Sequence, residues 1–202
     1  MDIDLSQSDL VQAKPADWKR VADITAEAFY TDPVNQWVFG KRQSIRSMFR
    51  VMAREMYLPQ GLCFLHPKGG ATMWMPPGVN AAPSQMGQIR FALGQVRHGT
   101  PSAIQRGLAL SALMQAWHPK EPHMYLFTIG TTAAARGKGV GKGLLAPVLS
   151  ACDAAGLPVY LENSNPDNTG FYGAHGFERM GIFEIGGDGT PVMEPMWREP
   201  KG

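Results

Sequence analysis

The feature that most constrains this chain is a glycine-rich run, Arg136–Gly143, which lies between an apolar stretch and a helical pattern. Residues 124–129 form an apolar and aromatic run typical of a central strand covered on both faces. Residues 144–152 carry apolar side chains at helical spacing. A strand, a glycine turn and a helix N-terminus together present backbone N–H groups and partial positive charge to an anion. We therefore predict an anion-binding loop.

The spacing of the glycines argues against two common phosphate loops. In the P-loop pattern G-x-x-x-x-G-K-[ST], Arg136 stands where the first glycine is needed, and Gly143 follows Lys142 where Ser or Thr is needed. The dinucleotide pattern G-x-G-x-x-G can be aligned from Gly137 or from Gly139. In the first alignment Lys142 occupies the position of the last glycine, and in the second Leu144 does, so neither fits. The loop therefore follows a different pattern.

The loop is similar to [QR]-x-x-G-x-[GA], the pyrophosphate loop of the GNAT (GCN5-related N-acetyltransferase) superfamily, which Arg136–Gly141 matches. Downstream, Asn168–Phe177 resembles that superfamily's second block, N-x-x-[FA]-[FY]-x-x-x-G-F. The closing Met196–Arg198 looks like the last strand of a bacterial-type small acetyltransferase. The resemblance covers residues 123–198 by motif and residues 11–75 by element order alone.

The resemblance implies an α/β protein of the GNAT fold, with a central mixed, twisted sheet flanked by helices. We expect residues 1–202 to form a single domain, in which 123–198 is the CoA-binding core and 76–120 is a helical insert between the third and fourth strands. Two amphipathic segments of the insert each predict a helix with one buried apolar face. Their apolar residues are Met86, Ile89, Leu93 and Val96 in the first segment, and Ile104, Leu108, Leu113, Met114 and Trp117 in the second.

The first part of the chain gives further local predictions. Pro15 suits a helix start, and Asp32 is placed to cap a second helix. Apolar spacing from Ile45 predicts a third helix that stops before Pro59, followed by a hairpin over residues 62–75. Pro147, inside the helix after the loop, predicts a kink or a late helix start.

The resemblance implies transfer of an acetyl group from acetyl-CoA to a primary amine by direct attack, without an enzyme nucleophile or a metal. The acceptor is expected to be a small molecule. The residues expected to bind the cofactor are Ile129, Gly130, Thr131, Arg136, Gly137, Lys138, Gly139, Val140, Gly141, Lys142, Asn168 and Tyr172.

The same resemblance suggests the catalytic residues. Tyr172 is the candidate general acid that protonates the departing CoA thiolate. Many relatives place a glutamate on the central strand, but Met124–Thr131 contains no carboxylate. Glu162, at the end of the next strand, is the candidate general base, and His123 is the second choice.

Two other functions are kept open. The absence of a carboxylate on the central strand also fits a catalytically inactive CoA-binding sensor or scaffold, which would bind CoA and acylate no amine. A nucleotide-binding α/β domain would instead be stabilised by ATP or NAD and not by CoA.

Composition narrows the partners. With 18% charged residues and a formal net charge of +2, the 202-residue chain gives no reason to expect nucleic acid or a membrane as the main partner. Cys63 and Cys152 lack metal spacing and are expected to be reduced. With no signal-like N-terminus, we expect a cytoplasmic protein. A homodimer is left open.

Overall fold

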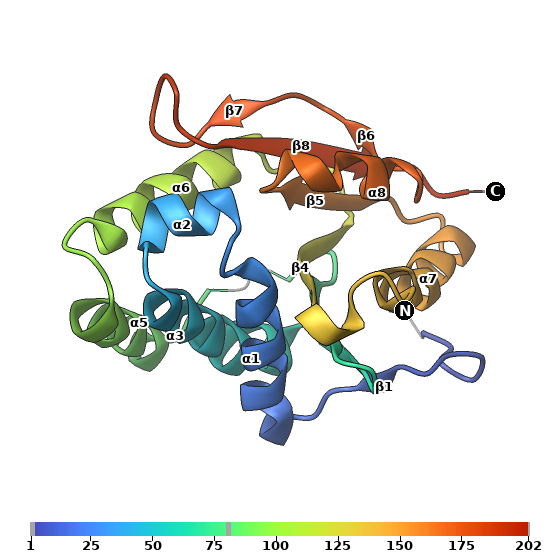
Figure 1. Ribbon diagram of the computed structural model, residues 1–202. Helices are drawn as coiled ribbons and strands as arrows, with labels where there is room; N and C mark the ends of the chain where they lie inside the picture. The colour runs from blue at the N-terminus through green and yellow to red at the C-terminus, as the bar shows by residue number, and fades with distance from the viewer. Residues whose placement is uncertain (1–2, 80–81, 202) are drawn as a thin grey trace.

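The computed structural model describes residues 3–79 and 82–201, whose strands form one twisted sheet (Figure 1). The strand order is β1-β2-β3-β4-β5-β8-β6, with β7 paired to β8. Its strands are β1 (Val11–Gln12), β2 (Leu62–His66), β3 (Gly70–Met75), β4 (Met124–Thr131), β5 (Val159–Asn163), β6 (Glu178–Arg179), β7 (Phe183–Glu184) and β8 (Val192–Arg198). Its helices are α1 (Trp18–Phe29), α2 (Pro33–Phe39), α3 (Arg42–Met52), α4 (Leu58–Gln60), α5 (Gln85–His98), α6 (Ala103–Trp117), α7 (Val140–Ala154) and α8 (Thr169–Gly173). This mixed α/β arrangement confirms the predicted fold class, with α5 and α6 between the third and fourth strands.

The sheet is covered on both faces, and strand alternation divides its side chains between two cores. On β4, Tyr125 and Phe127 pack with α1 and α3, whereas Met124 and Leu126 pack with α7. Figure 1 shows α7 on one side of β4 and α1 with α3 on the other. A strand buried on both faces has no polar side, which explains the nearly continuous apolar run in the sequence.

The two parallel strands at the centre of the sheet separate early. β4 and β5 pair at three positions only, from Met124 with Val159 to Leu126 with Leu161. Beyond Leu126, β4 stays paired with β3 on its other edge as far as Thr131, while β5 continues against β8. The β4 edge that faces β5 is therefore left without a strand partner from residue 127 onward.

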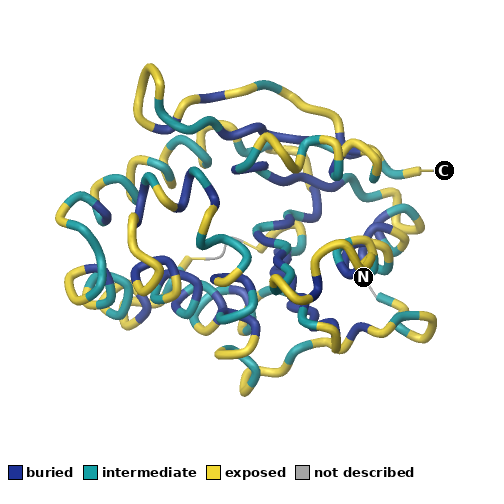
Figure 2. Tube along the Cα trace, in the orientation of Figure 1, coloured by how far each residue is buried: buried dark blue, intermediate teal, exposed yellow. Residues whose placement is uncertain are grey.

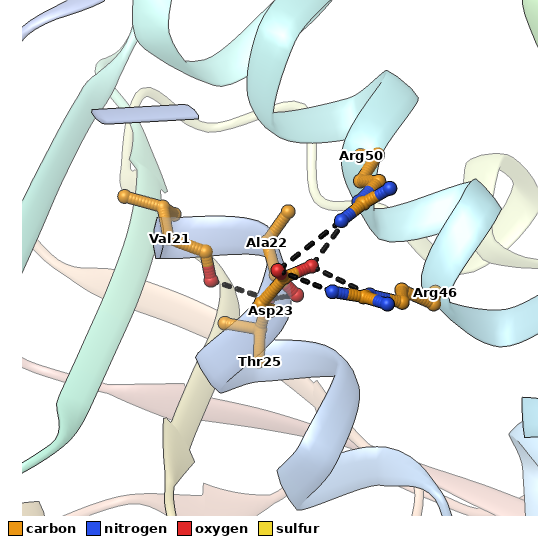
Figure 3. Close-up of polar contacts among 6 residues, drawn as sticks. All are labelled: Val21, Ala22, Asp23, Thr25, Arg46 and Arg50. Atoms are coloured by element: carbon orange, nitrogen blue, oxygen red, sulfur yellow. Dashed lines mark hydrogen bonds and ion pairs between the residues drawn. The ribbon is translucent and has the colours of Figure 1, made fainter. Parts of the chain in front are cut away.

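Helix α1 lies very close to β4, and a glycine makes this possible. A Cβ on Gly130 would lie 2.9 Å from Cβ of Ala28 and 3.1 Å from Cα of Thr25. Helix α1 is also joined to α3, because the Asp23 carboxylate on α1 accepts hydrogen bonds from both Arg46 and Arg50 of α3 (Figure 3). These contacts fix α1 between α3 and the central strand.

The two helices predicted in the insert are confirmed, but the prediction that their apolar residues are buried is wrong for several of them. Met86, Ile89, Leu93 and Val96 of α5 are all exposed, Val96 to 78% (Figure 2). In α6, Leu108 and Trp117 are also exposed.

The buried face of α5 is instead formed by small and polar residues. Gly87 and Gln95 are buried, and Gln95 accepts a hydrogen bond from the Ser44 hydroxyl on α3. A Cβ on Gly94 would lie 2.0 Å from Oγ of Ser47. Because glycines allow close helix approach, α5 docks on α3 through positions that a hydrophobicity pattern scores as neutral.

Three local predictions need comment. Asp32 caps α2 as expected, its carboxylate accepting from the Asn35 N–H at 2.8 Å. The helical run after Ile45 does not stop before Pro59: a π-helical turn (Ala53–Tyr57) leads into α4, where Pro59 lies in the first turn and needs no hydrogen-bond donor. Helix α7 begins directly after Gly139 and includes Pro147, so its start is not late.

Candidate active site

The glycine loop leaves several backbone donors free. Gly137 and Gly139 have φ values of +71° and +74°, which glycine adopts readily, and a Cβ on either would meet nothing within 4 Å. Gly139 is the N-cap of α7, and no side chain caps that end. Within the described residues, the N–H groups of residues 139–142 have no hydrogen-bond acceptor. The loop therefore offers an open cluster of donors at a helix N-terminus, which fits a pyrophosphate.

The second motif packs directly on this loop. A Cβ on Gly141 would lie 3.3 Å from Cζ of Phe171, so glycine is needed there for α8 to approach α7. Asn168 is exposed at the start of α8. The structure thus brings together the loop and the Asn168–Phe177 segment that the sequence separates.

The free edge of β4 continues toward the same loop. Ile129, Gly130 and Thr131 pair with β3 on one edge and face the gap left by β5 on the other. Three basic side chains of the loop, Arg136, Lys138 and Lys142, are exposed. An extended chain with amide groups and an anionic end, such as the pantetheine and pyrophosphate of CoA, fits this combination of strand edge and donor cluster.

Glu162 lies at the point where β4 and β5 separate. It follows Leu161, the last β5 residue paired with β4. Its side chain is only 2% exposed, and Oε1 is buried without a hydrogen-bond partner among the described residues. A buried carboxylate is energetically costly, and the Tyr125 and Tyr160 hydroxyls are the groups that interact with it, which marks this position as a functional candidate.

Aromatic side chains surround this carboxylate. Tyr57, Tyr125 and Tyr160 all have pKa values raised above the ordinary tyrosine value, first by burial and then by the negative charge of Glu162. These phenols therefore stay protonated. Glu162 thus lies in a site lined by neutral hydroxyl groups.

Two histidines complete the cluster. His118, the residue that ends α6, has Nδ1 at 3.8 Å from Oε1 of Glu162. Its Nε2 lies 3.1 Å from Nε2 of His123. His123 is the second candidate for the general base in the sequence. His118 cannot be identified as a candidate from the sequence, because it belongs to the insert and follows no catalytic motif. The sequence shows only that it is a histidine at the end of an amphipathic segment.

Tyr172 occupies a different environment. It is buried between Phe171 and Phe177, and its pKa is raised by burial and then by the charge of Asp32. Asp32 accepts a 2.5 Å hydrogen bond from the Ser164 hydroxyl just beyond β5, and burial raises its own pKa. Tyr172 is therefore a protonated phenol, as a general acid requires.

The cysteines offer no nucleophile. Burial raises the pKa of Cys63 to about 12 and that of Cys152 to about 11. Since the thiolate is the reactive form, both are unreactive at neutral pH. Within residues 3–79 and 82–201, no group of three or more His, Cys, Asp or Glu residues is placed to hold a metal, and no helix of this part has the length and apolar character of a membrane span.

Three tryptophans have structural contacts that account for their positions. Trp74 is fully buried in the core beside α7. Trp37 contacts the Arg106 guanidinium, and Trp117 stacks on Phe183. An open hollow of about 400 Å³ lies near Asp32, lined by Pro33, Pro166, Gly189, Thr190, Pro191 and Val192.

Comparison with known proteins agrees with this fold. Residues 103–177 match the family model described as the acetyltransferase (GNAT) family. An uncharacterised N-acetyltransferase of Schizosaccharomyces pombe is 27% identical over 208 residues, covering 95% of this chain and 82% of that protein.

Solved structures give the same result. The Corynebacterium glutamicum protein named histone acetyltransferase HPA2 and related acetyltransferase has a TM-score of 0.68 and 23% identity, covering 96% of each chain. Arylalkylamine N-acetyltransferase 2 of Aedes aegypti has a TM-score of 0.65 and 11% identity, covering 95% of this chain and 98% of that one.

The fold, the family match and the relatives define this protein as an N-acyltransferase. Its residues 103–177 match the GNAT acetyltransferase family, and the GNAT fold generally uses acetyl-CoA as the acyl donor.

Proposed function

We propose that this protein transfers the acetyl group of acetyl-CoA to a primary amine of a small molecule by direct attack, with Glu162 as general base and Tyr172 as general acid. The observation that carries the proposal is the position of Glu162: a carboxylate with a 2% exposed side chain, at the point where β4 and β5 separate and 3.8 Å from His118. This position compensates for the lack of a carboxylate on β4 itself.

Binding is proposed to use backbone groups. The N–H groups of residues 139–142 hold the pyrophosphate at the N-terminus of α7, with Arg136, Lys138 and Lys142 around it. The free β4 edge at Ile129, Gly130 and Thr131 pairs with the pantetheine arm, and Asn168 anchors the arm from the opposite side. One β4 N–H polarises the thioester carbonyl, which is stabilisation of the oxyanion type.

The chemistry needs two proton movements. An alkylammonium of pKa near 10 must first lose a proton, which Glu162 accepts. As the N–C bond forms and the C–S bond breaks, Tyr172 donates its proton to the sulfur. The nitrogen loses a second proton when the amide forms, and this proton replaces the one that Tyr172 has given up. Neither cysteine takes part, because both are buried thiols.

The enclosure of Glu162 favours a small acceptor. Its side chain is 2% exposed and lies close to Tyr57, Tyr125 and Tyr160 at the point where β4 and β5 separate, so a slender amine is expected to reach it more readily than a bulky one. A slender alkylamine or arylalkylamine fits this requirement better than a lysine on a folded protein surface.

The test is an amine screen that follows thiol release from acetyl-CoA. The panel contains primary alkylamines, arylalkylamines and a lysine-containing peptide. With the best acceptor, Tyr172→Phe is expected to lower kcat about 100-fold, the scale of general acid catalysis. Tyr30→Phe removes the same hydroxyl from a half-buried tyrosine outside the proposed site, serves as the control and should retain activity. Tight acetyl-CoA binding with no amine acetylated would favour the sensor or scaffold function instead.

A further inference from the structure

We infer that His118, contributed by the helical insert, is the positioning residue that keeps Glu162 ionised and returns its proton to solvent. The inference rests on the proposed role of Glu162 as base. It comes from the contacts of the two residues, which link the insert to the point where β4 and β5 separate.

The tautomer of His123 is fixed by a backbone carbonyl. Its Nδ1 lies 2.7 Å from the carbonyl oxygen of Glu121, which can only accept, so Nδ1 carries the hydrogen. Burial lowers the pKa of His123, so the ring stays neutral and its Nε2 is a hydrogen-bond acceptor. The ring of His123 therefore needs a donor on that side.

His118 is that donor. Its Nε2 lies 3.1 Å from Nε2 of His123 and must carry a hydrogen, which leaves its Nδ1 facing Oε1 of Glu162 at 3.8 Å. A carboxylate offers no hydrogen to that nitrogen. The arrangement is electrostatically favourable when His118 also carries a proton on Nδ1, which makes it an imidazolium beside a carboxylate.

The other groups around the pair cannot take this role. Tyr57 from the π-helical turn, Tyr125 from β4 and Tyr160 from β5 are protonated phenols, as shown by their raised pKa values. The Glu121 side chain is exposed, and Glu121 meets His123 through its backbone carbonyl. Among the described residues around Glu162, His118 is therefore the group that can carry a compensating positive charge near neutral pH.

The exposure of His118 gives the proton a way out. Its side chain is 29% exposed, compared with 2% for Glu162. When Glu162 takes the proton of the ammonium group, the imidazolium loses its charged partner and releases its Nδ1 proton to water. The proton on Glu162 then moves to Nδ1, and the ionised pair is restored. One proton passes from the amine to solvent, and no other reactant is needed.

The first arm of the test does not depend on activity. Proton NMR of the imidazole resonances is followed against pH in the wild type and in Glu162→Gln, with the His118 signal among the five histidines assigned from His118→Gln. Removal of the carboxylate that faces Nδ1 at 3.8 Å should change the His118 imidazole resonances and their dependence on pH. An unchanged midpoint would overturn the inference.

The second arm uses the pH dependence of kcat/KM with the best amine. Without the imidazolium, the buried carboxylate takes up a proton more readily, so the acidic limb of the His118→Gln profile should move to higher pH, with the Kd for acetyl-CoA unchanged. His118→Asn repeats the test, and His98→Gln, on α5, is the control. If the acidic limb of the kcat/KM profile of the His118 variants stays at the wild-type pH, the inference is contradicted.

The two proposals can fail separately. If no amine is acetylated but the His118 midpoint still depends on Glu162, the pair stands and the proposed function fails. If amines are acetylated and neither the midpoint nor the limb responds, the proposed function stands and the role of His118 fails.

Discussion

The two halves of the proposed site are built in opposite ways. The loop at residues 136–142 is one continuous stretch of chain, open to solvent, and its useful atoms are backbone N–H groups. The side chains of the Glu162 cluster come from four segments that are distant in the sequence. Glu162 lies on β5, His118 on the insert, Tyr125 on β4 and Tyr57 on the π-helical turn. The loop is thus a local device, whereas the cluster exists only in the folded protein.

This difference predicts that binding and proton transfer can be disrupted independently. Changes in the loop should act on acetyl-CoA affinity. Changes in the cluster should act on the rate after acetyl-CoA has bound.

The largest effect is expected from added charge in the loop. Gly139→Glu combined with Gly141→Glu places two carboxylates where the anion should bind, and should weaken acetyl-CoA binding about 100-fold or more. Calorimetric titration measures the Kd. Glutamates at Ala154 and Ala155, at the other end of α7, make the same charge change and should leave the Kd within a few-fold. Equal loss in both variants would contradict a local phosphate site.

The next effect concerns Gly130, which lies on β4 between Tyr125 of the Glu162 cluster and the loop. Gly130→Ala puts a methyl group 2.9 Å from Cβ of Ala28 and should lower the free energy of unfolding by about 1–3 kcal/mol through overpacking. Gly173→Ala, whose Cβ meets nothing within 4 Å, is the control. Urea denaturation measures both, and equal stability of the two variants would mean that α1 does not constrain β4 in this way.

The smallest effect is expected from the exposed lysines of the loop. Lys138→Ala and Lys142→Ala should each raise the Kd about two- to five-fold, because exposed charges contribute about 1 kcal/mol or less. The loss should shrink further as salt is added. A loss as large as that of the double glutamate variant would show that side chains, rather than the backbone, hold the phosphates.

The same contrast explains what the sequence alone predicts. The loop and the Asn168–Phe177 segment are recognisable because their function depends on glycines and spacing within a few residues. The hairpin follows from periodicity, and the fold class follows from the resemblance of these motifs to the GNAT superfamily.

The parts that could not be predicted depend on tertiary contacts. His118 reaches Glu162 only because α6 ends beside β5, a relation that no local pattern encodes. The exposed apolar residues of α5 show the same limit, because Gly94 and Gln95 pack on α3 in place of the apolar stripe. After Phe177 the chain forms two short strands, β6 and β7, and each is held by pairing to β8 rather than by a pattern of its own.

The most direct test of the account is a single-turnover experiment on Glu162→Gln with acetyl-CoA bound in advance. The account predicts a Kd for acetyl-CoA equal to that of the wild type and acyl transfer to the best amine about 100-fold slower, the scale of general base catalysis. An unchanged transfer rate would contradict the role of Glu162 as the base. Loss of acetyl-CoA binding would contradict the separation of the buried cluster from the loop.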